Sequence, residues 1–257
     1  MSDVDAIVAQ VLMLETALFH AYARLEARAD SEALHDLRIN LRRMRSLLRP
    51  LRAIGETALL NEAAAEVGKL TTPVRDLEVL VDELERQGLT QQANIRKAVL
   101  HSSYGCIVES STLHLFFSRL DAWPSAFRAA ERQGELRPLR KKIAKRLQKQ
   151  VERLNTALAD PQHDRHQLRI QVKRTRYATD AYPELSPISA EAAASLKAVQ
   201  SALGAWHDHF QWCLKARQEA DLQPLQPVWH AAETTALMSA EAELLKLSGL
   251  LAENRQA

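Results

Sequence analysis

A basic motif occurs twice in this 257-residue chain, and the second copy keeps every spacing of the first. The first copy reads His35-x-x-Arg38-x-x-x-Arg42-Arg43-x-Arg45. The second, 131 residues later, reads His166-x-x-Arg169-x-x-x-Lys173-Arg174-x-Arg176. A repeat with this period indicates two similar halves, which we place at about residues 1–130 and 131–257 of a single domain, 1–257.

The composition favours helices nearly throughout. Gly and Pro number only seven and nine, aromatic residues make up 5% of the chain, and Ala, Leu, Glu, Arg and Gln dominate. Apolar residues recur at spacings of three and four, the period of an amphipathic helix. The helices predicted from this pattern are 3–29, 32–53, 56–69, 73–87, 90–121, 135–159, 161–182, 187–203, 206–220 and 225–253.

Capping residues support several of these boundaries. Gly88 and Gly134 fit helix ends. Trp123-Pro124 interrupts a long helical pattern, so we place the seam between the halves from Trp123 to Gly134. Three sites pair a capping side chain with a proline at the first helical position: Thr72-Pro73, Asp160-Pro161 and Ser186-Pro187.

The fold class that follows is all-α. No flexible linker joins the halves, so we expect two antiparallel helical bundles related by an internal pseudo-twofold repeat. We expect them to pack into one unit with a basic central groove.

On a helical wheel, the basic residues of each motif form one continuous stripe, here called a ridge. The first ridge holds His35, Arg38, Arg42, Arg45, Arg49 and Arg52, and the second holds His166, Arg169, Lys173 and Arg176. Pro50 should kink or end the first helix near Arg49. An apolar stripe one residue earlier accompanies the first ridge, so the ridge should lie beside the core, at the mouth of a groove.

The formal net charge of +2 conceals an uneven distribution. Residues 35–52, 137–153 and 166–176 hold 18 of the 34 cationic side chains and only 2 of the 32 acidic ones. The protein is therefore an acidic body with concentrated basic segments, which favours a localised anion site. Like charges one turn apart cost about 0.2–0.5 kcal/mol per pair, and a bound anion would relieve that repulsion.

The remaining features give fewer clues. The amino terminus lacks the charge and apolar run of a secretory signal, and no stretch approaches 18 uninterrupted apolar residues. We therefore expect a soluble, cytoplasmic protein with no membrane partner. Cys106 and Cys213 lack metal-ligand spacing and are interpreted as small, buried or half-buried side chains in a reducing compartment.

The doubled motif resembles the paired sequence motifs of the CHAD family, histidine-containing all-helical domains that bind inorganic polyphosphate. The second copy continues into Tyr177, and an Asp-bearing block follows each copy: Val74-Arg75-Asp76-Leu77-Glu78-Val79-Leu80 and Leu203-Gly204-Ala205-Trp206-His207-Asp208. The resemblance covers about residues 8–250. The chain departs from it at Thr72-Pro73, where the second block has Gly204-Ala205, and it lacks the ExExK motif of the catalytic domain often fused to the family.

The resemblance implies a basic channel for polyphosphate and a place on polyphosphate granules. Matching positions carry over as phosphate contacts: His35, Arg38, Arg42, Arg45, His166, Arg169, Lys173 and Arg176. Further candidates are the remaining motif residues Arg43 and Arg174, the ridge residue Arg49, the carry-overs Lys69 and Lys197, and the basic segment before the second motif with Arg140, Lys141 and Lys145. We expect no catalytic residue, no metal ligand and no cofactor.

Two other functions compete with this interpretation. An HD-type metal-dependent phosphohydrolase is suggested by His35-Asp36, His163-Asp164 and His207-Asp208, but cations one turn from His35 and His166 would repel a divalent ion. A single-stranded nucleic-acid binder would interleave cations with aromatic platforms, and the ridges offer only Tyr177. Nothing favours a scaffold for acidic proteins. The oligomeric state is open.

Overall fold

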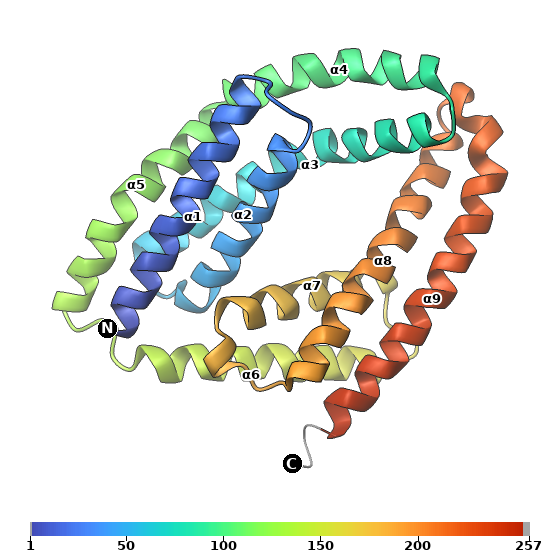
Figure 1. The fold of residues 1–257 in the computed structure, drawn as a ribbon. Helices are drawn as coiled ribbons and strands as arrows, with labels where there is room; N and C mark the ends of the chain where they lie inside the picture. Colours follow the sequence, from blue (N-terminus) through green and yellow to red (C-terminus); the bar gives the residue numbers. More distant parts are fainter. Residues whose placement is uncertain (1, 254–257) are drawn as a thin grey trace. The chain divides into compact units, whose positions relative to one another are not determined.

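A computed structural model describes residues 2–253, and these form nine α-helices, three short 3-10 helices and no strand (Figure 1). The all-α class is confirmed. The chain divides into two compact units, Met1–Lys142 and Ile143–Ala257.

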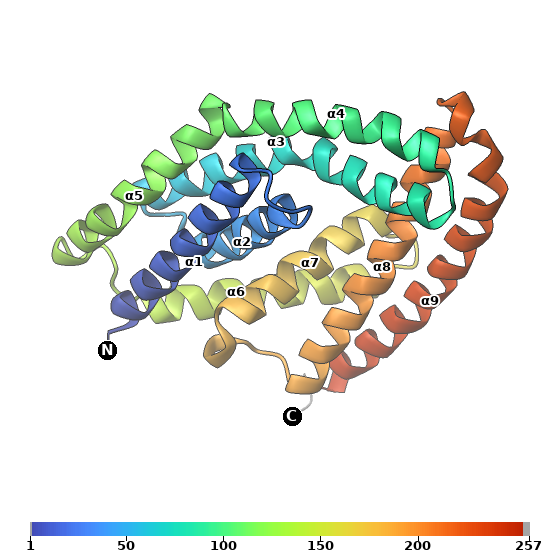
Figure 2. The same cartoon turned by 45° about the horizontal axis from the view of Figure 1, so that its top comes forward.

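The first unit is organised around one long central helix. α3 packs against α2, α4 and α5, and α1 packs against α2. α1 runs antiparallel to α2, and α3 runs antiparallel to α4, in both ribbon views (Figures 1 and 2). The elements are α1 (Asp3–Glu26), α2 (Ala33–Leu48), a 3-10 turn (Arg49–Leu51), α3 (Gly55–Arg86), α4 (Thr90–Val108) and α5 (Ser111–Arg132).

The second unit centres on the antiparallel pair α8 and α9, with α7 packed against α8. Side chains of α6 join the same core, which includes Leu154, Val172, Leu203 and Leu247, all nearly inaccessible to solvent. The elements are α6 (Leu139–Leu158), which begins in the first unit, α7 (Arg165–Ala181), α8 (Ala190–Ala216), α9 (Gln226–Glu253) and the 3-10 turns Pro183–Leu185 and Ala220–Leu225.

The two helices expected at 56–69 and 73–87 are a single helix, α3, which continues through Pro73. The prediction was wrong because buried residues lie on both sides of the proline, among them Val67, Thr71 and Leu80, and hold the two segments against the core as one helix. This packing outweighs the hydrogen bond that an internal proline removes.

α8 is likewise continuous where we expected separate helices at 187–203 and 206–220. Gly204 lies inside it, because flanking Leu203 and Trp206 are both buried in the core and hold the helix across the glycine. The cap is Ser189, which accepts from the Ala192 N–H, and not Ser186. Similarly, α7 begins after Asp164, which accepts from the Gln167 N–H, and not at Pro161.

The helix expected over 90–121 is interrupted at Glu109–Ser110, and Pro124 lies within α5. Ser110 caps α5 by accepting from the Leu113 N–H at 3.2 Å. Trp123, which we took as a break, is buried and donates from its indole to Thr57 Oγ1 at 2.9 Å. Tertiary packing of this indole outweighs the local breaking tendency of the proline.

Other expectations are confirmed. Gly88 and Gly134 follow helices α3 and α5 with φ of 75° and 78°, the left-handed conformation that glycine adopts without strain. α2 changes to a 3-10 turn at Arg49, next to Pro50. The apolar stripe beside the first ridge is buried throughout: Leu34, Leu37, Leu41, Met44 and Leu48.

α1 has the length and composition of a membrane-crossing helix, with a mean hydropathy of 1.4 over its most apolar window. Here it contributes Val11, Leu18 and Ala21 to the core of the first unit, and apolar residues of this kind are expected in a core helix.

Both cysteines are free. Cys213 is buried, as expected, whereas Cys106 is exposed, contrary to expectation.

Candidate anion-binding site

The first ridge lies along α2 in the first unit, beside the buried apolar stripe. His35, Arg38, Arg42, Arg45 and Arg49 are all half-buried, so each guanidinium or imidazole is partly withdrawn from solvent. Arg43, from the same motif, and Arg52 are exposed. The position predicted from the helical wheel, at the edge of the core, is therefore confirmed for the ridge itself.

Arg38 is fixed by neutral oxygens of α3. Its Nη1 donates to the Gly68 carbonyl at 3.1 Å and to Thr71 Oγ1 at 2.6 Å, and its Nη2 donates to Thr72 Oγ1 at 3.2 Å. Burial, together with repulsion from Arg42, lowers the pKa of Arg38 to about 10. The guanidinium remains charged at neutral pH. It is already partly desolvated in the folded protein, before any anion binds.

Arg45 reaches the same turn of α3. A Cβ atom on Gly68 would lie 3.8 Å from Arg45 Nη1, which places this guanidinium against the glycine. The turn that contains Gly68 and Thr71 therefore positions two arginines that stand two helical turns apart on α2.

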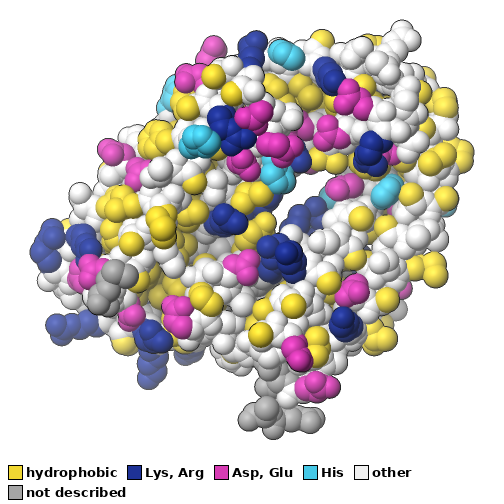
Figure 3. All heavy atoms as spheres, in the orientation of Figure 1, with side chains coloured by type: hydrophobic (Ala, Val, Ile, Leu, Met, Phe, Trp, Pro, Cys, Tyr) yellow, Lys and Arg dark blue, Asp and Glu magenta, His cyan; other side chains and the backbone are white. Residues whose placement is uncertain are grey.

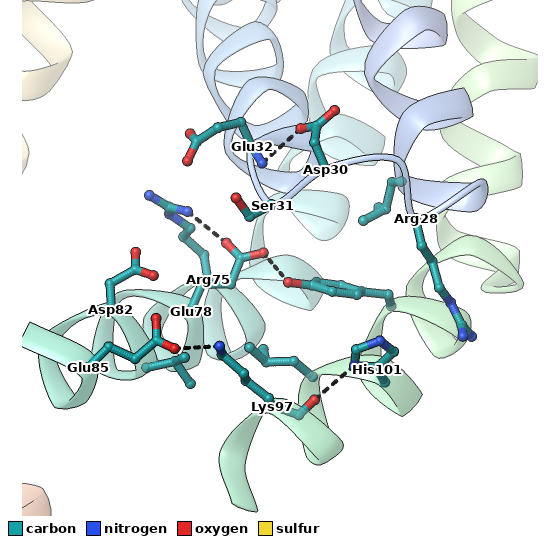
Figure 4. A pocket seen from close by; sticks show the side chains of 14 residues that line it. Arg28, Asp30, Ser31, Glu32, Arg75, Glu78, Asp82, Glu85, Lys97 and His101 are labelled. Atoms are coloured by element: carbon teal, nitrogen blue, oxygen red, sulfur yellow. Dashed lines mark hydrogen bonds and ion pairs between the residues drawn. The ribbon is translucent and has the colours of Figure 1, made fainter. Parts of the chain in front are cut away.

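Arg75, one turn further along α3, adds a third cation that sequence reasoning missed. Its Nη1 pairs with Glu78 Oε2 at 2.8 Å, and the Tyr104 hydroxyl donates to Glu78 Oε1 at 2.6 Å, so a buried carboxylate holds Arg75 in place. Figure 4 shows Arg75 and Glu78 joined in this way. Burial and the charge of Arg75 both lower the pKa of His35, which places Arg75 near the first ridge.

A pocket of about 380 Å³ is lined by Arg75, and most of the charged groups around it are acidic. Figure 3 shows Asp and Glu side chains gathered over the loop between α1 and α2 and the facing turns of α3. Glu85 pairs there with Lys97, and burial raises the pKa of Asp82. The carboxylates outnumber the lining cations Arg28, Arg75 and Lys97, so the pocket is less suited to an anion than the ridge. The pocket carboxylates are Asp30, Glu32, Glu78, Asp82 and Glu85 (Figure 4).

The second ridge lies along α7 in the second unit. His166 is exposed, and Arg169, Lys173 and Arg176 are half-buried. Arg176 pairs with Asp180 at 3.5 Å and lies over the ring of Tyr177, 5.1 Å from its centroid. The end of this ridge is therefore partly neutralised, whereas its first three members lie near another basic group.

That group is His207 on α8, which the sequence analysis placed in a His-Asp pair and in the second Asp-bearing block but did not assign to the site. Its ring centroid lies 5.2 Å from that of His166. Burial, followed by repulsion from Arg169, His166 and Lys173, lowers the pKa of His207 to about 4. The imidazole is therefore neutral at pH 7, amid cations that oppose its protonation.

A sequence signal could have identified both missed residues. Arg75 and His207 each directly precede the Asp of a downstream block, and they are 132 residues apart. Each lies close to the ridge of its own unit.

The remaining predicted residues lie on exposed surfaces. Lys69 pairs with Glu66 at 2.7 Å, and Arg140 lies 3.5 Å from Asp3, so each of these cations has an acidic partner. Neither is drawn toward the anchored arginines. The other exposed candidates are Arg43, Lys141, Lys145, Arg174 and Lys197.

Comparison with known proteins gave two kinds of match. Residues 12–217 match the family model described as the CHAD domain. Two similar solved structures are the CHAD domain from the plant Ricinus communis (18% identity, TM-score 0.62, covering 99% of this chain and 92% of that one) and PptA from Streptomyces chartreusis (20% identity, TM-score 0.61, covering 93% and 98%). A search of curated proteins returned no match.

Proposed function

The chain belongs to the CHAD family, and from this premise we propose that it binds inorganic polyphosphate without catalysis, through its two basic ridges. Guanidinium forks and ammonium groups pair with phosphoryl oxygens, and the histidines add donors when protonated. The expectation that both ridges line one central groove stays a prediction.

The observation that carries the proposal is the crowding of cations at each ridge. Arg38 donates to the neutral oxygens of Gly68, Thr71 and Thr72, and its pKa is lowered. In the other unit, the pKa of His207 is lowered to about 4 in part by three neighbouring ridge residues. Burial is the largest cause of both shifts, but repulsion from neighbouring cations lowers both pKa values further, and a polyanion would relieve that repulsion.

The chemistry of the ridges favours an unbranched phosphate chain over nucleic acid. At about 1.5 Å per residue, the first ridge from His35 to Arg49 spans roughly 21 Å and can contact several successive phosphates. Among the second-ridge neighbours, the aromatic ring of Tyr177 lies beneath Arg176. A base-stacking protein instead presents aromatic platforms between its cations.

The same potential argues against the HD-type phosphohydrolase. A divalent ion at His207 would lie among Arg169, His166 and Lys173, which repel it as they repel a proton. The proposal therefore assigns binding and not hydrolysis. Its expected setting is the cytoplasm, on polyphosphate granules.

Charge reversal on both ridges tests the proposal. The double variant Arg42→Glu with Lys173→Glu should lose the gel shift produced by long polyphosphate, because each ridge gains a repelling carboxylate at its centre. The matched control is Arg132→Glu with Lys246→Glu, which makes the same charge change at exposed positions on α5 and α9. Far-ultraviolet circular dichroism should show equal helicity in all proteins. Binding retained by the ridge variant, or lost by the control, would contradict the assignment.

Competition and salt dependence then identify the ligand class. Long polyphosphate should displace both single-stranded and duplex DNA at matched charge. Its affinity should fall steeply with salt, with a log–log slope of roughly 0.7 per phosphate contact if the value for single strands applies. A flat salt titration, or DNA as the stronger competitor, would overturn polyphosphate as the ligand.

A further inference from the structure

A cluster of three metal-ligating side chains lies in the second unit, on α8 and α9. Cys213 comes from α8, and His230 and Glu233 come from the beginning of α9. One ligand atom from each, a sulfur, an imidazole nitrogen and a carboxylate oxygen, lies within 4.8 Å of the other two. The sequence showed no such group because its members are separated along the chain.

The local fold explains why these side chains meet. His230 and Glu233 are three residues apart, so they project from the same face of α9, and His230 Nδ1 lies 3.4 Å from Glu233 Oε2. The neighbouring residues Trp212 and Trp229 pack with their ring centroids 5.6 Å apart, and Trp229 is fully buried. This aromatic contact joins the two helices beside the cluster and limits how far the three ligands can separate.

The three side chains of the cluster differ in their exposure to solvent. Cys213 is 4% exposed, the Glu233 side chain 19% and the His230 side chain 73%. The sulfur is therefore at the base, the imidazole is at the mouth, and an ion can enter from solvent without opening the core.

We propose that Cys213, His230 and Glu233 bind a divalent transition-metal ion of the zinc type, with a water molecule as the fourth ligand. Thiolate, imidazole and carboxylate are the ligands zinc prefers, in tetrahedral geometry with bonds of about 2.0–2.3 Å. Ligand atoms around such an ion lie roughly 3.5 Å apart, so small side-chain rotations close the site. Binding releases the thiol proton of Cys213 to solvent, and the two anionic ligands then balance the charge of the ion.

Cobalt substitution tests the site directly. The purified protein, free of polyphosphate, should take up one Co²⁺ per chain and show a thiolate-to-cobalt charge-transfer band with visible absorption of tetrahedral type. Cys213→Ser should lose the charge-transfer band, and His230→Gln should weaken binding by roughly tenfold or more. The matched controls are Cys106→Ser and His101→Gln, which change an exposed cysteine and an exposed histidine on α4.

The controls should bind cobalt as the wild type does. Because the His230 side chain is largely exposed, His230→Gln will keep its fold even if Cys213→Ser does not, and its weakened binding remains decisive. Quenching of tryptophan fluorescence by Co²⁺ gives a second readout through Trp212 and Trp229. No stoichiometric uptake by the wild type, or an unchanged cobalt spectrum in His230→Gln, would overturn the proposal. Neither outcome bears on polyphosphate binding.

Discussion

Polyphosphate binding should change the protonation of His207. In the free protein, burial and three neighbouring ridge residues hold its pKa at about 4, below the ordinary value of 6.5. A bound phosphate chain adds negative charge beside the imidazole. It opposes the repulsion from Arg169, His166 and Lys173 but leaves the burial in place, so the pKa of His207 should rise on binding.

Linkage converts that rise into a change in affinity. If binding restored the pKa fully to 6.5, affinity at pH 5.5 would exceed that at pH 8 by about tenfold. If it raised the pKa only to about 5.5, because burial persists, the gain would be about twofold. Because the complex holds the proton more tightly than the free protein does, the affinity for polyphosphate must increase as pH falls.

Isothermal titration calorimetry with long polyphosphate at pH 5.5 and pH 8 measures this gain. His207→Gln should remove its share of the pH dependence, whereas His101→Gln, on α4 in the other unit, should retain it. Titration of terminal phosphates affects all three proteins equally and cancels in the comparison. An identical pH dependence in the wild type and His207→Gln would refute the reasoning, as would a His207 resonance that still titrates near pH 4 in the complex.

Three predictions concern stability. Thr71→Val should lower the free energy of unfolding by about 1–2 kcal/mol in urea titrations, because Arg38 loses a buried acceptor; no loss would show that this hydrogen bond is unimportant. Ser110→Ala should cost about 1 kcal/mol by removing the cap on the Leu113 N–H, and a neutral effect would contradict the boundary of α5. Without ligand, the melting temperature should fall as pH drops from 6.5 towards 4, because His207 is protonated at a higher pH in the unfolded state than in the folded state. His207→Gln should reduce this dependence of melting temperature on pH, and an unchanged dependence would exclude the histidine as its source.

The helical period was sufficient to predict the fold class and both ridges. Leu37, Leu41 and Met44 are buried where the wheel placed the apolar stripe, and the cations follow at the edge of the core. Apolar and cationic residues that recur every three or four positions share one face of a single helix, so their placement can be predicted from the sequence alone.

Helix boundaries and cross-helix partners depend on contacts that are distant in sequence. Pro73 and Gly204 suggested breaks, but buried residues on both sides of each keep α3 and α8 continuous. The position of His207 beside His166, and of Cys213 beside α9, follows from which helix faces meet. Residue spacing along a single helix carries no such information.

If the first ridge binds phosphate as proposed, the anchoring of Arg38 on α3 lowers the entropy cost of that binding. A guanidinium already held by Gly68 and Thr71 loses little rotational freedom when a phosphate arrives, which spares about 0.5–1.5 kcal/mol of ordering entropy. Lys69, exposed and paired with Glu66, must both reorient and give up that partner. The unit thus has a preorganised cation, Arg38, and an adaptable one, Lys69. We expect Arg38 to contribute most to affinity, and Lys69 to adjust to phosphate chains of different length and curvature.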